Sequence, residues 1–198
     1  MTRTALGFRA HSGWAALVAL ADSSRPPVVV HRQRLQLSDP ASVDAKQPFH
    51  AAENLPLRQA EQWIARCTRT TRQRAQDELA GVIEKLHLRG FEVAACGNLR
   101  ASGRPLGTLA ATLASHALIH TAEGEFYRDV LVHASQQCRL PVREFKEREL
   151  FENAGGTLKL SSDELEWILR DWGKLLGPPW QQDQKYAALA AWLALAPA

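Results

Sequence analysis

The chain has 198 residues, of which 45% are hydrophobic and 23% charged, and its formal net charge is +3. This composition predicts a folded protein with a sizeable core and excludes a disordered or low-complexity chain. The longest apolar runs fall short of the roughly 20 residues that a membrane-spanning helix needs. The mild positive charge permits a polyanionic partner without requiring one.

The three cysteines, Cys67, Cys96 and Cys138, are far apart and form neither a CxxC pair nor a zinc-finger spacing. An odd number of cysteines suits a reducing compartment better than a disulfide scaffold. The sequence also does not open with a basic segment followed by an apolar core, as a signal peptide would. We therefore expect a cytoplasmic protein with buried thiols, folded as a single domain over residues 1–198.

The first half of the chain predicts a three-stranded meander followed by a long helix. Residues 4–9, 13–21 and 28–37 are rich in apolar and β-branched residues and are separated by turn residues. Residues 38–56 contain three prolines and predict a loop. From residue 57 to about 89 the apolar side chains recur at helical spacing, which predicts a helix with one buried face.

The second half of the chain alternates strands and helices, which predicts βαβ units. The expected elements are a strand at 91–96, a loop at 100–105, helices at 106–116 and 123–137, a strand at 140–145, a flexible Gly155-Gly156 turn, a helix that Ser161 and Glu164 begin with a capping box, and a last helix at 183–195. A meander followed by βαβ units indicates an α/β fold with a mixed sheet flanked by helices.

The opening hairpin, Thr-Ala-Leu-Gly-Phe-Arg-Ala-His-Ser-Gly-Trp-Ala-Ala-Leu-Val-Ala-Leu over residues 4–20, resembles that of the ribonuclease H-like superfamily, especially its Holliday-junction resolvase branch. The similarity continues through residues 128–134 and 140–145, which look like the central helix and fifth strand of that family. The segment 183–190 is similar to its Asp-rich last helix. The resemblance implies a ribonuclease H-like fold and a nucleic-acid partner.

The resemblance also implies that most metal ligands are missing. The family's first strand carries a metal-binding Asp where this chain has Arg9, and a guanidinium has no lone pair to offer Mg²⁺. The fourth strand ends in Ala95-Cys96-Gly97-Asn98, where the family has a Glu. On the last helix Asp183 matches one acidic position and Tyr186 stands at the other. Because two-metal hydrolysis needs several carboxylates, the resemblance implies a fold without its ordinary nuclease mechanism. For Asp183, the alternative is a charge favoured at a helix N-terminus.

The densest polar cluster of the chain suggests a second site. His116 and His120 are four residues apart and share a face on a continuous helix, with Glu123 three residues further on. Two imidazoles and a carboxylate are a suitable ligand set for Zn²⁺, Mn²⁺ or Fe²⁺. With Glu125 and Asp183 as further catalytic candidates, this set predicts a relocated, metal-dependent site.

An alternative interpretation treats the same segment as the start of a surface helix. Thr121 would be the N-cap residue, and Glu123 and Glu125 would oppose the helix dipole in the first turn. This alternative does not explain the two histidines, so both interpretations stay open.

Arginines suggest a surface for phosphates. The candidate nucleic-acid-binding residues are Arg9, Arg66, Arg69, Arg100 and Arg104. The alternative for the helical members is a solvated face, since Glu61, Asp77 and Glu78 lie nearby in the sequence.

Three further segments carry functional hints. The segment Lys46–His50 combines a cation, an amide, an aromatic ring and an imidazole in an expected loop. The charged run 147–152 is typical of a solvated surface. Trp172 and Trp180 flank a Gly-Pro-Pro turn and suggest an exposed patch for a partner subunit.

Three hypotheses follow. The first is a catalytically degenerate, resolvase-like protein that binds nucleic acid. The second is a metal-dependent hydrolase or nuclease with a relocated His/Glu site, whose divalent metal the sequence does not identify. The third is a protein–protein scaffold, in which a homodimer or another protein covers the tryptophan patch. Whether the chain is an enzyme stays open, since one fold hosts many functions.

Overall fold

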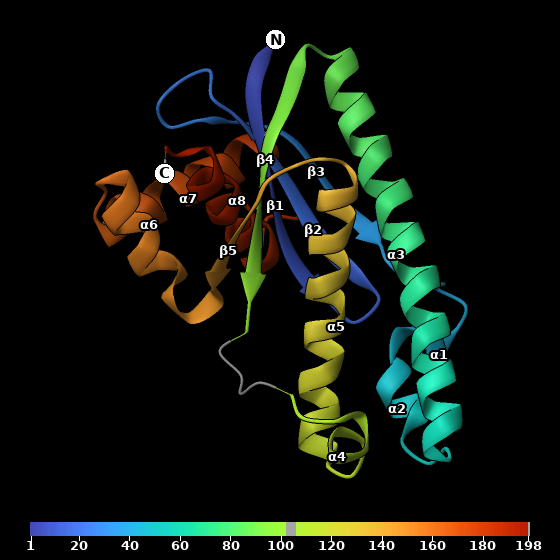
Figure 1. The fold of residues 1–198 in the computed structure, drawn as a ribbon. Helices are drawn as coiled ribbons and strands as arrows, with labels where there is room; N and C mark the ends of the chain where they lie inside the picture. The colour runs from blue at the N-terminus through green and yellow to red at the C-terminus, as the bar shows by residue number, and fades with distance from the viewer. Residues whose placement is uncertain (102–105, 198) are drawn as a thin grey trace.

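The computed structural model describes residues 1–101 and 106–197, and it contains a five-stranded sheet in the order β3-β2-β1-β4-β5 (Figure 1). The strands are β1 (Thr2–His11), β2 (Trp14–Ala21), β3 (Val28–Gln36), β4 (Phe91–Arg100) and β5 (Val142–Lys146). β1, β2 and β3 pair antiparallel, whereas β4 runs parallel to β1 and β5 parallel to β4. The fold class predicted from the sequence is confirmed.

Helices cover both faces of the sheet. The helices are α1 (Val43–Lys46), α2 (Pro48–Ala52), α3 (Leu57–Leu88), α4 (Leu109–Leu113), α5 (His116–Gln137), α6 (Leu150–Leu158), α7 (Ser162–Leu176) and α8 (Gln182–Leu195), with a 3₁₀ turn at Glu147–Glu149. Figure 1 shows α3 and α5 on one face and α8 on the other, with α6 and α7 beside α8. No helix within the described ranges is long and apolar enough to cross a membrane.

The side chains of the strands point alternately into two cores, one on each face of the sheet. In β2, Leu17 packs toward α3 and α5, whereas Val18 and Leu20 pack toward α8. Every second side chain of a strand points to the same face, so a strand covered on both faces is apolar throughout. In β1, Leu6 and Phe8 belong to the α3/α5 core, and Ala5 belongs to the α8 core. The same alternation turns the next odd-numbered residues of β1 toward α8.

Two glycines let α8 lie unusually close to the sheet. A Cβ atom at Gly7 of β1 would overlap the carbonyl oxygen of Ala187, and one at Gly97 of β4 would overlap that of Ala190. The α8 residues from Ala187 to Leu195 other than Trp192 are buried, and many of them are alanines. Small residues on both sides therefore bring the two backbones into contact, which places the first turn of α8 beside the end of β1.

The expectation of a loop over residues 38–56 is wrong, because α1 and α2 lie there. Ser42 caps α1 by accepting a hydrogen bond from the Ala45 amide at 3.1 Å. Pro48 stands at the first position of α2, where its missing N–H costs nothing. One of the prolines that indicated a loop therefore begins a short helix.

Other boundaries also differ from the prediction, and β4 continues to Arg100 instead of ending near Cys96. The expected helix over 106–116 is the shorter α4, and α5 begins at His116 instead of near Glu123. Thr121 is not an N-cap residue, since its hydroxyl donates to the Ala117 carbonyl inside α5 at 3.0 Å. Gly155 and Gly156 lie within α6 and form no turn. The capping box of Ser161 and Glu164 is confirmed.

Candidate functional site

The first polar cluster lies where the end of β1 meets the start of α8, and Arg9 is at its centre. The Arg9 guanidinium donates from Nη1 to Asp183 Oδ1 at 2.6 Å and from Nη2 to Glu147 Oε1 at 2.7 Å. The three side chains are only 15%, 23% and 28% exposed, respectively. The end of β1 therefore carries a guanidinium that is paired with two carboxylates. We call Arg9, His11, Glu147, Asp183 and Tyr186 the Arg9 cluster.

Aromatic rings hold this cluster in place. His11 Nε2 lies 2.9 Å from the same Asp183 oxygen that Arg9 binds. The His11 ring stacks on the Trp14 ring with centroids 4.3 Å apart. The Arg34 guanidinium lies over the Trp14 ring as well, 4.1 Å from its centroid. Arg9 itself lies 4.8 Å from the centroid of the Tyr186 ring. The Asp183 carboxylate is therefore fixed by two donors.

The electrostatics keep Arg9 charged. Partial burial acts to lower the pKa of Arg9, but the hydrogen bond and charge of Glu147, followed by those of Asp183, outweigh it and raise this pKa above its ordinary value. A permanently charged guanidinium occupies oxygen lone pairs that a divalent ion would otherwise need.

The end of β4 contributes an amide that faces away from the Arg9 cluster. Asn98 is buried and pairs with Phe8 in the parallel ladder. Its Nδ2 group donates to the Arg128 carbonyl on α5 at 3.3 Å. Asn98 therefore serves the α5 side of the sheet.

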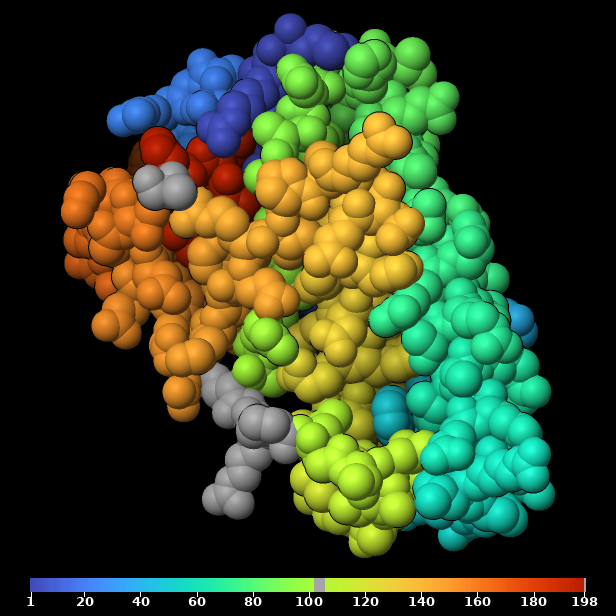
Figure 2. Space-filling view, viewed as in Figure 1, coloured from blue at the N-terminus to red at the C-terminus, as the bar shows by residue number. Residues whose placement is uncertain are grey.

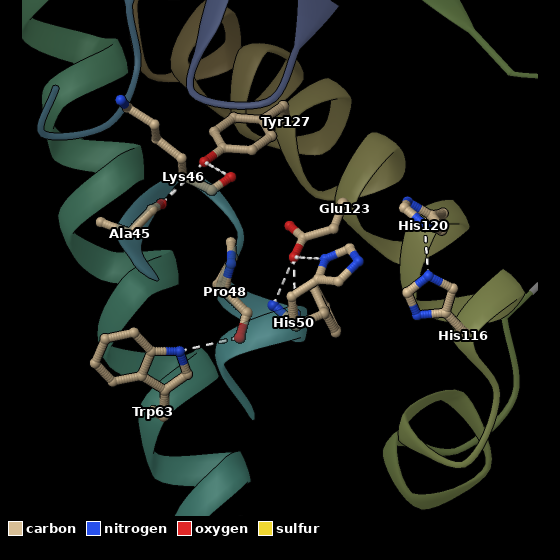
Figure 3. A network of polar contacts seen from close by, with 10 residues as sticks. Ala45, Lys46, Pro48, His50, Trp63, His116, His120, Glu123 and Tyr127 are labelled. Atoms are coloured by element: carbon tan, nitrogen blue, oxygen red, sulfur yellow. Dashed lines mark hydrogen bonds and ion pairs between the residues drawn. The ribbon is translucent and has the colours of Figure 1, made fainter. Parts of the chain in front are cut away.

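The second polar cluster joins α2 to the first turns of α5, and we call His50, His116, His120 and Glu123 the histidine cluster (Figure 3). One nitrogen of each of the three histidines lies within 4.8 Å of the others. Glu123 is buried, and its Oε1 atom accepts from the Phe49 and His50 amides at 2.8 and 3.1 Å and lies 3.2 Å from His50 Nδ1. Because α5 begins at His116, both of its histidines and Glu123 lie on one continuous helix.

The buried carboxylate has an unusual environment. Burial raises the pKa of Glu123, although the hydrogen bonds from His50 and Phe49 act in the opposite direction. Its Oε2 atom is buried with no hydrogen-bond partner among the described residues. The carboxylate thus binds α2 through one oxygen only.

The remaining predicted catalytic residues lie outside the histidine cluster. Glu125 pairs with Arg128 at 3.4 Å and approaches Arg100 at 4.0 Å. Asp183 belongs to the Arg9 cluster, on the α8 side of the sheet. The structure places His50, not Glu123, with His116 and His120. Glu123 contacts His50, and Asp183 lies apart from all of them.

The predicted nucleic-acid-binding residues differ in availability. Arg66 and Arg69 are exposed on α3, and the Arg66 guanidinium lies 4.8 Å from the centroid of the Trp63 ring. Arg100 is half exposed and pairs with Glu144 at 3.1 Å. Arg9 is engaged in its two ion pairs. The prediction for Arg104 lies outside the described residues.

The groove beside Arg69 has mixed charge. It runs between α3 and β3, and its charged lining residues are Arg69, Arg74, Asp77, Glu78 and Lys85. Along α3, Asp77 and Glu78 lie between Arg74 and Lys85, so the part of the groove at residues 69–74 is its most basic part.

The expected tryptophan patch is wrong for Trp172, which is buried in the α8 core. Trp180 is half-buried, and its Nε1 group donates to the Leu169 carbonyl at 2.6 Å. The two rings pack edge to face with centroids 6.4 Å apart. They contribute to the core under α7, which removes the observation that suggested a partner there.

Sequence reasoning missed His11 and Glu147, and it noted His50 only as part of a loop. Glu147 lies 138 residues from Arg9, and His50 lies 73 residues from Glu123. Local spacing carries no signal for such pairs. The fact that Glu147 follows directly after a strand could have indicated it, since the ends of parallel strands meet at one edge of a sheet.

Comparison with solved structures supports the fold. The chain is similar to the Thermus thermophilus RuvC structure, with a TM-score of 0.52 and 12% identity over 96% of this chain and 92% of that chain. It is also similar to T. thermophilus RuvC in complex with Holliday junction substrate, with a TM-score of 0.51 and 12% identity over 96% and 91% of the two chains. No family model and no curated protein matches the sequence. The similarity establishes a ribonuclease H-like fold.

Proposed function

We propose that this chain is a resolvase-like nucleic-acid-binding protein in which an arginine ion-pair cluster replaces the metal-dependent cleavage centre. The observation that carries the proposal is the position of Arg9. It stands at the end of β1, where the resemblance implies a metal-binding Asp, and it binds two carboxylates.

The chemistry of this cluster opposes two-metal hydrolysis. That mechanism needs carboxylates that hold two ions about 4 Å apart on either side of the scissile phosphate. Here Asp183 and Glu147 already share a cation that is covalently part of the chain. A divalent ion would have to displace a guanidinium held by hydrogen bonds of 2.6 and 2.7 Å. The cluster therefore favours a structural role over a cleavage role.

Two observations support nucleic acid as the partner. One of the similar structures, T. thermophilus RuvC, is a complex with a Holliday junction substrate. In this chain α3 carries four arginines and no acidic residue between positions 62 and 76. Figure 2 shows α3 along one edge of the molecule, open to solvent over much of its length on the face drawn. Such an array attracts phosphates without reading bases.

The binding half of the proposal is tested with a four-way DNA junction and a duplex of matched length, both in EDTA. We expect junction binding that weakens steeply with salt. The double variant Arg66→Ala/Arg69→Ala should lower the slope of log K against log salt by about 2, roughly one per lost phosphate contact. Arg170→Ala, an exposed arginine on α7, is the matched control and should leave the slope unchanged. Absence of binding to both DNAs contradicts this half.

The cleavage half is tested by incubating labelled junctions with the protein and Mg²⁺ or Mn²⁺. We expect no product. Cleavage that Asp183→Asn abolishes would show an active centre at α8 and would overturn the proposal. Cleavage that His116→Ala abolishes and Asp183→Asn leaves unchanged would favour the alternative, a metal-dependent hydrolase with a relocated site.

A further inference from the structure

The histidine cluster has the composition and geometry of a metal site that the proposed function does not use. His50 belongs to α2, and His116 and His120 lie one turn apart on α5. The His50 ring centroid lies 5.5 Å from that of His116 and 4.7 Å from that of His120. Figure 3 shows the His50 ring directed toward the two α5 rings. Three imidazoles from two elements thus converge.

One ring nitrogen of His50 is already committed, which leaves the other free. Nδ1 lies 3.2 Å from Glu123 Oε1, so the carboxylate favours the tautomer with the proton on Nδ1. Nε2 then carries the lone pair. Metal-ligating histidines usually donate their second N–H to a carboxylate or a carbonyl, which orients the ring and increases its basicity. Glu123 supplies this arrangement, and its buried position on α5 fixes it.

The two α5 histidines already lie at a spacing that suits a shared metal ion. Their Nε2 atoms lie 3.1 Å apart. In a tetrahedral site with Zn–N bonds of about 2.0–2.1 Å, neighbouring ligand nitrogens are about 3.3 Å apart. The histidine pair is close to that spacing before any metal binds. The His50 nitrogen lies within 4.8 Å of both and would have to move up to about 1.5 Å closer to reach this spacing.

We propose that His50, His116 and His120 bind a transition-metal ion of the Zn²⁺ class, with Glu123 as the positioning carboxylate behind His50. A set of imidazoles selects Zn²⁺ or its neighbours and not Mg²⁺ or Ca²⁺, which prefer oxygen ligands. His116 and His120 are exposed, so a fourth coordination position faces solvent and is open to water. Bound metal would also join α2 to α5.

The site is tested by calorimetric titration of ZnCl₂, and separately of MgCl₂, into the full chain. We expect one Zn²⁺ per chain and no heat from Mg²⁺. Glu123→Gln, which keeps the shape of the side chain, should lower the Zn²⁺ affinity by about 10–100-fold. His50→Ala, His116→Ala and His120→Ala should each lower it further. The matched control is His87→Ala, an exposed histidine on α3, which should change nothing.

One result in particular overturns the proposal. If His116→Ala and His120→Ala lower the affinity but His50→Ala does not, Zn²⁺ binds only the pair on α5 and the three-histidine site is wrong. Equal affinity of all variants also overturns it. His116 and His120 are exposed, so their variants should keep the fold, and circular dichroism checks this. The visible spectrum of bound Co²⁺ gives an independent readout, with tetrahedral bands expected in the wild type and lost in His50→Ala.

Discussion

The Arg9 cluster and the histidine cluster lie on opposite faces of one sheet and satisfy their polar groups in opposite ways. The Arg9 cluster combines two carboxylates with a cation that the chain itself supplies. The histidine cluster has three converging imidazoles, and its one carboxylate is turned toward the backbone of α2. We therefore expect the Arg9 cluster to reject an added metal ion and the histidine cluster to accept one.

The two clusters also differ in what holds them. Arg9 stands on the central strand β1, and Asp183 stands on α8, which contacts the sheet closely at Gly7 of β1 and Gly97 of β4. His50 stands on α2, a helix of five residues whose Phe49 and His50 amides donate to the distant Glu123 carboxylate. We therefore expect the geometry of the Arg9 cluster to survive the loss of a single contact, and that of the histidine cluster to change when a contact of α2 is lost.

The largest effect should come from changing the charge at the centre of the Arg9 cluster. Arg9→Asp removes the cation and adds a third carboxylate, which should lower the free energy of unfolding in EDTA by about 3–5 kcal/mol. Mg²⁺ should restore part of this loss, because the variant offers three carboxylates. Urea denaturation with and without Mg²⁺ measures both effects.

Arg9→Met is the matched control for this prediction. It removes the cation without adding a ligand, so it should be destabilised and gain little from Mg²⁺. An Arg9→Asp variant as stable in EDTA as the wild type would show that the ion pairs contribute nothing, and the contrast between the clusters would fail.

The second-largest loss of stability should come from disturbing the contact between α8 and the sheet. Gly97→Ala would push its methyl group into the Ala190 carbonyl, and overpacking of this kind should cost about 3 kcal/mol. Gly81→Ala on α3 meets no atom within 4 Å and should stabilise the chain by about 0.5–1 kcal/mol. Thermal unfolding of the two variants compares them directly. If both glycines tolerate alanine equally, α8 does not lie as close to β4 as described.

The sequence predicted the fold better than the sites, and the reason is the range of the interactions involved. Strands and the long helix leave a periodic pattern of apolar residues, so β1 to β3 and α3 were predicted nearly to their ends. The short helix α2 leaves no such pattern, and Pro48 indicated a loop. The start of α5 was misplaced because Thr121 resembles an N-cap residue, whereas its hydroxyl bonds within the helix.

The site residues were harder to predict than the fold, because most of their contacts join residues that are distant in the sequence. The helical spacing of His116 and His120 indicated their shared face. The approach of His50 depends on how α2 packs, and the pairing of Glu147 with Arg9 depends on the order of β4 and β5 in the sheet. Both need the whole topology. Arg9 could be singled out from the sequence because the resemblance implies a metal-binding Asp at its position.

A moderate effect should follow from removing the carboxylate that holds α2. Glu123→Ala leaves the Phe49 and His50 amides without their acceptor and should cost about 2 kcal/mol, as hydrogen bonds to charged groups do. Hydrogen exchange should rise at these amides while α3 stays protected. Glu125→Ala, two residues further along the same helix, removes only the 3.4 Å ion pair with Arg128 and a 4.0 Å approach to Arg100, and should cost less than about 1 kcal/mol. Equal effects of the two changes would mean that α2 does not depend on Glu123.

The smallest effect on stability should separate the two clusters most clearly. The Tyr127 hydroxyl donates to the Ala45 and Lys46 carbonyls at 3.0 and 2.9 Å, just before α2 (Figure 3). Tyr127→Phe removes only this group and should cost about 1 kcal/mol. Because His50 reaches the histidine cluster through the same short segment, the variant should also bind Zn²⁺ more weakly. The junction affinity should stay unchanged, because α3 and the Arg9 cluster do not depend on Tyr127. If Tyr127→Phe instead loses DNA binding and keeps its Zn²⁺ affinity, then the DNA-binding surface, and not the histidine cluster, depends on the Tyr127 hydroxyl.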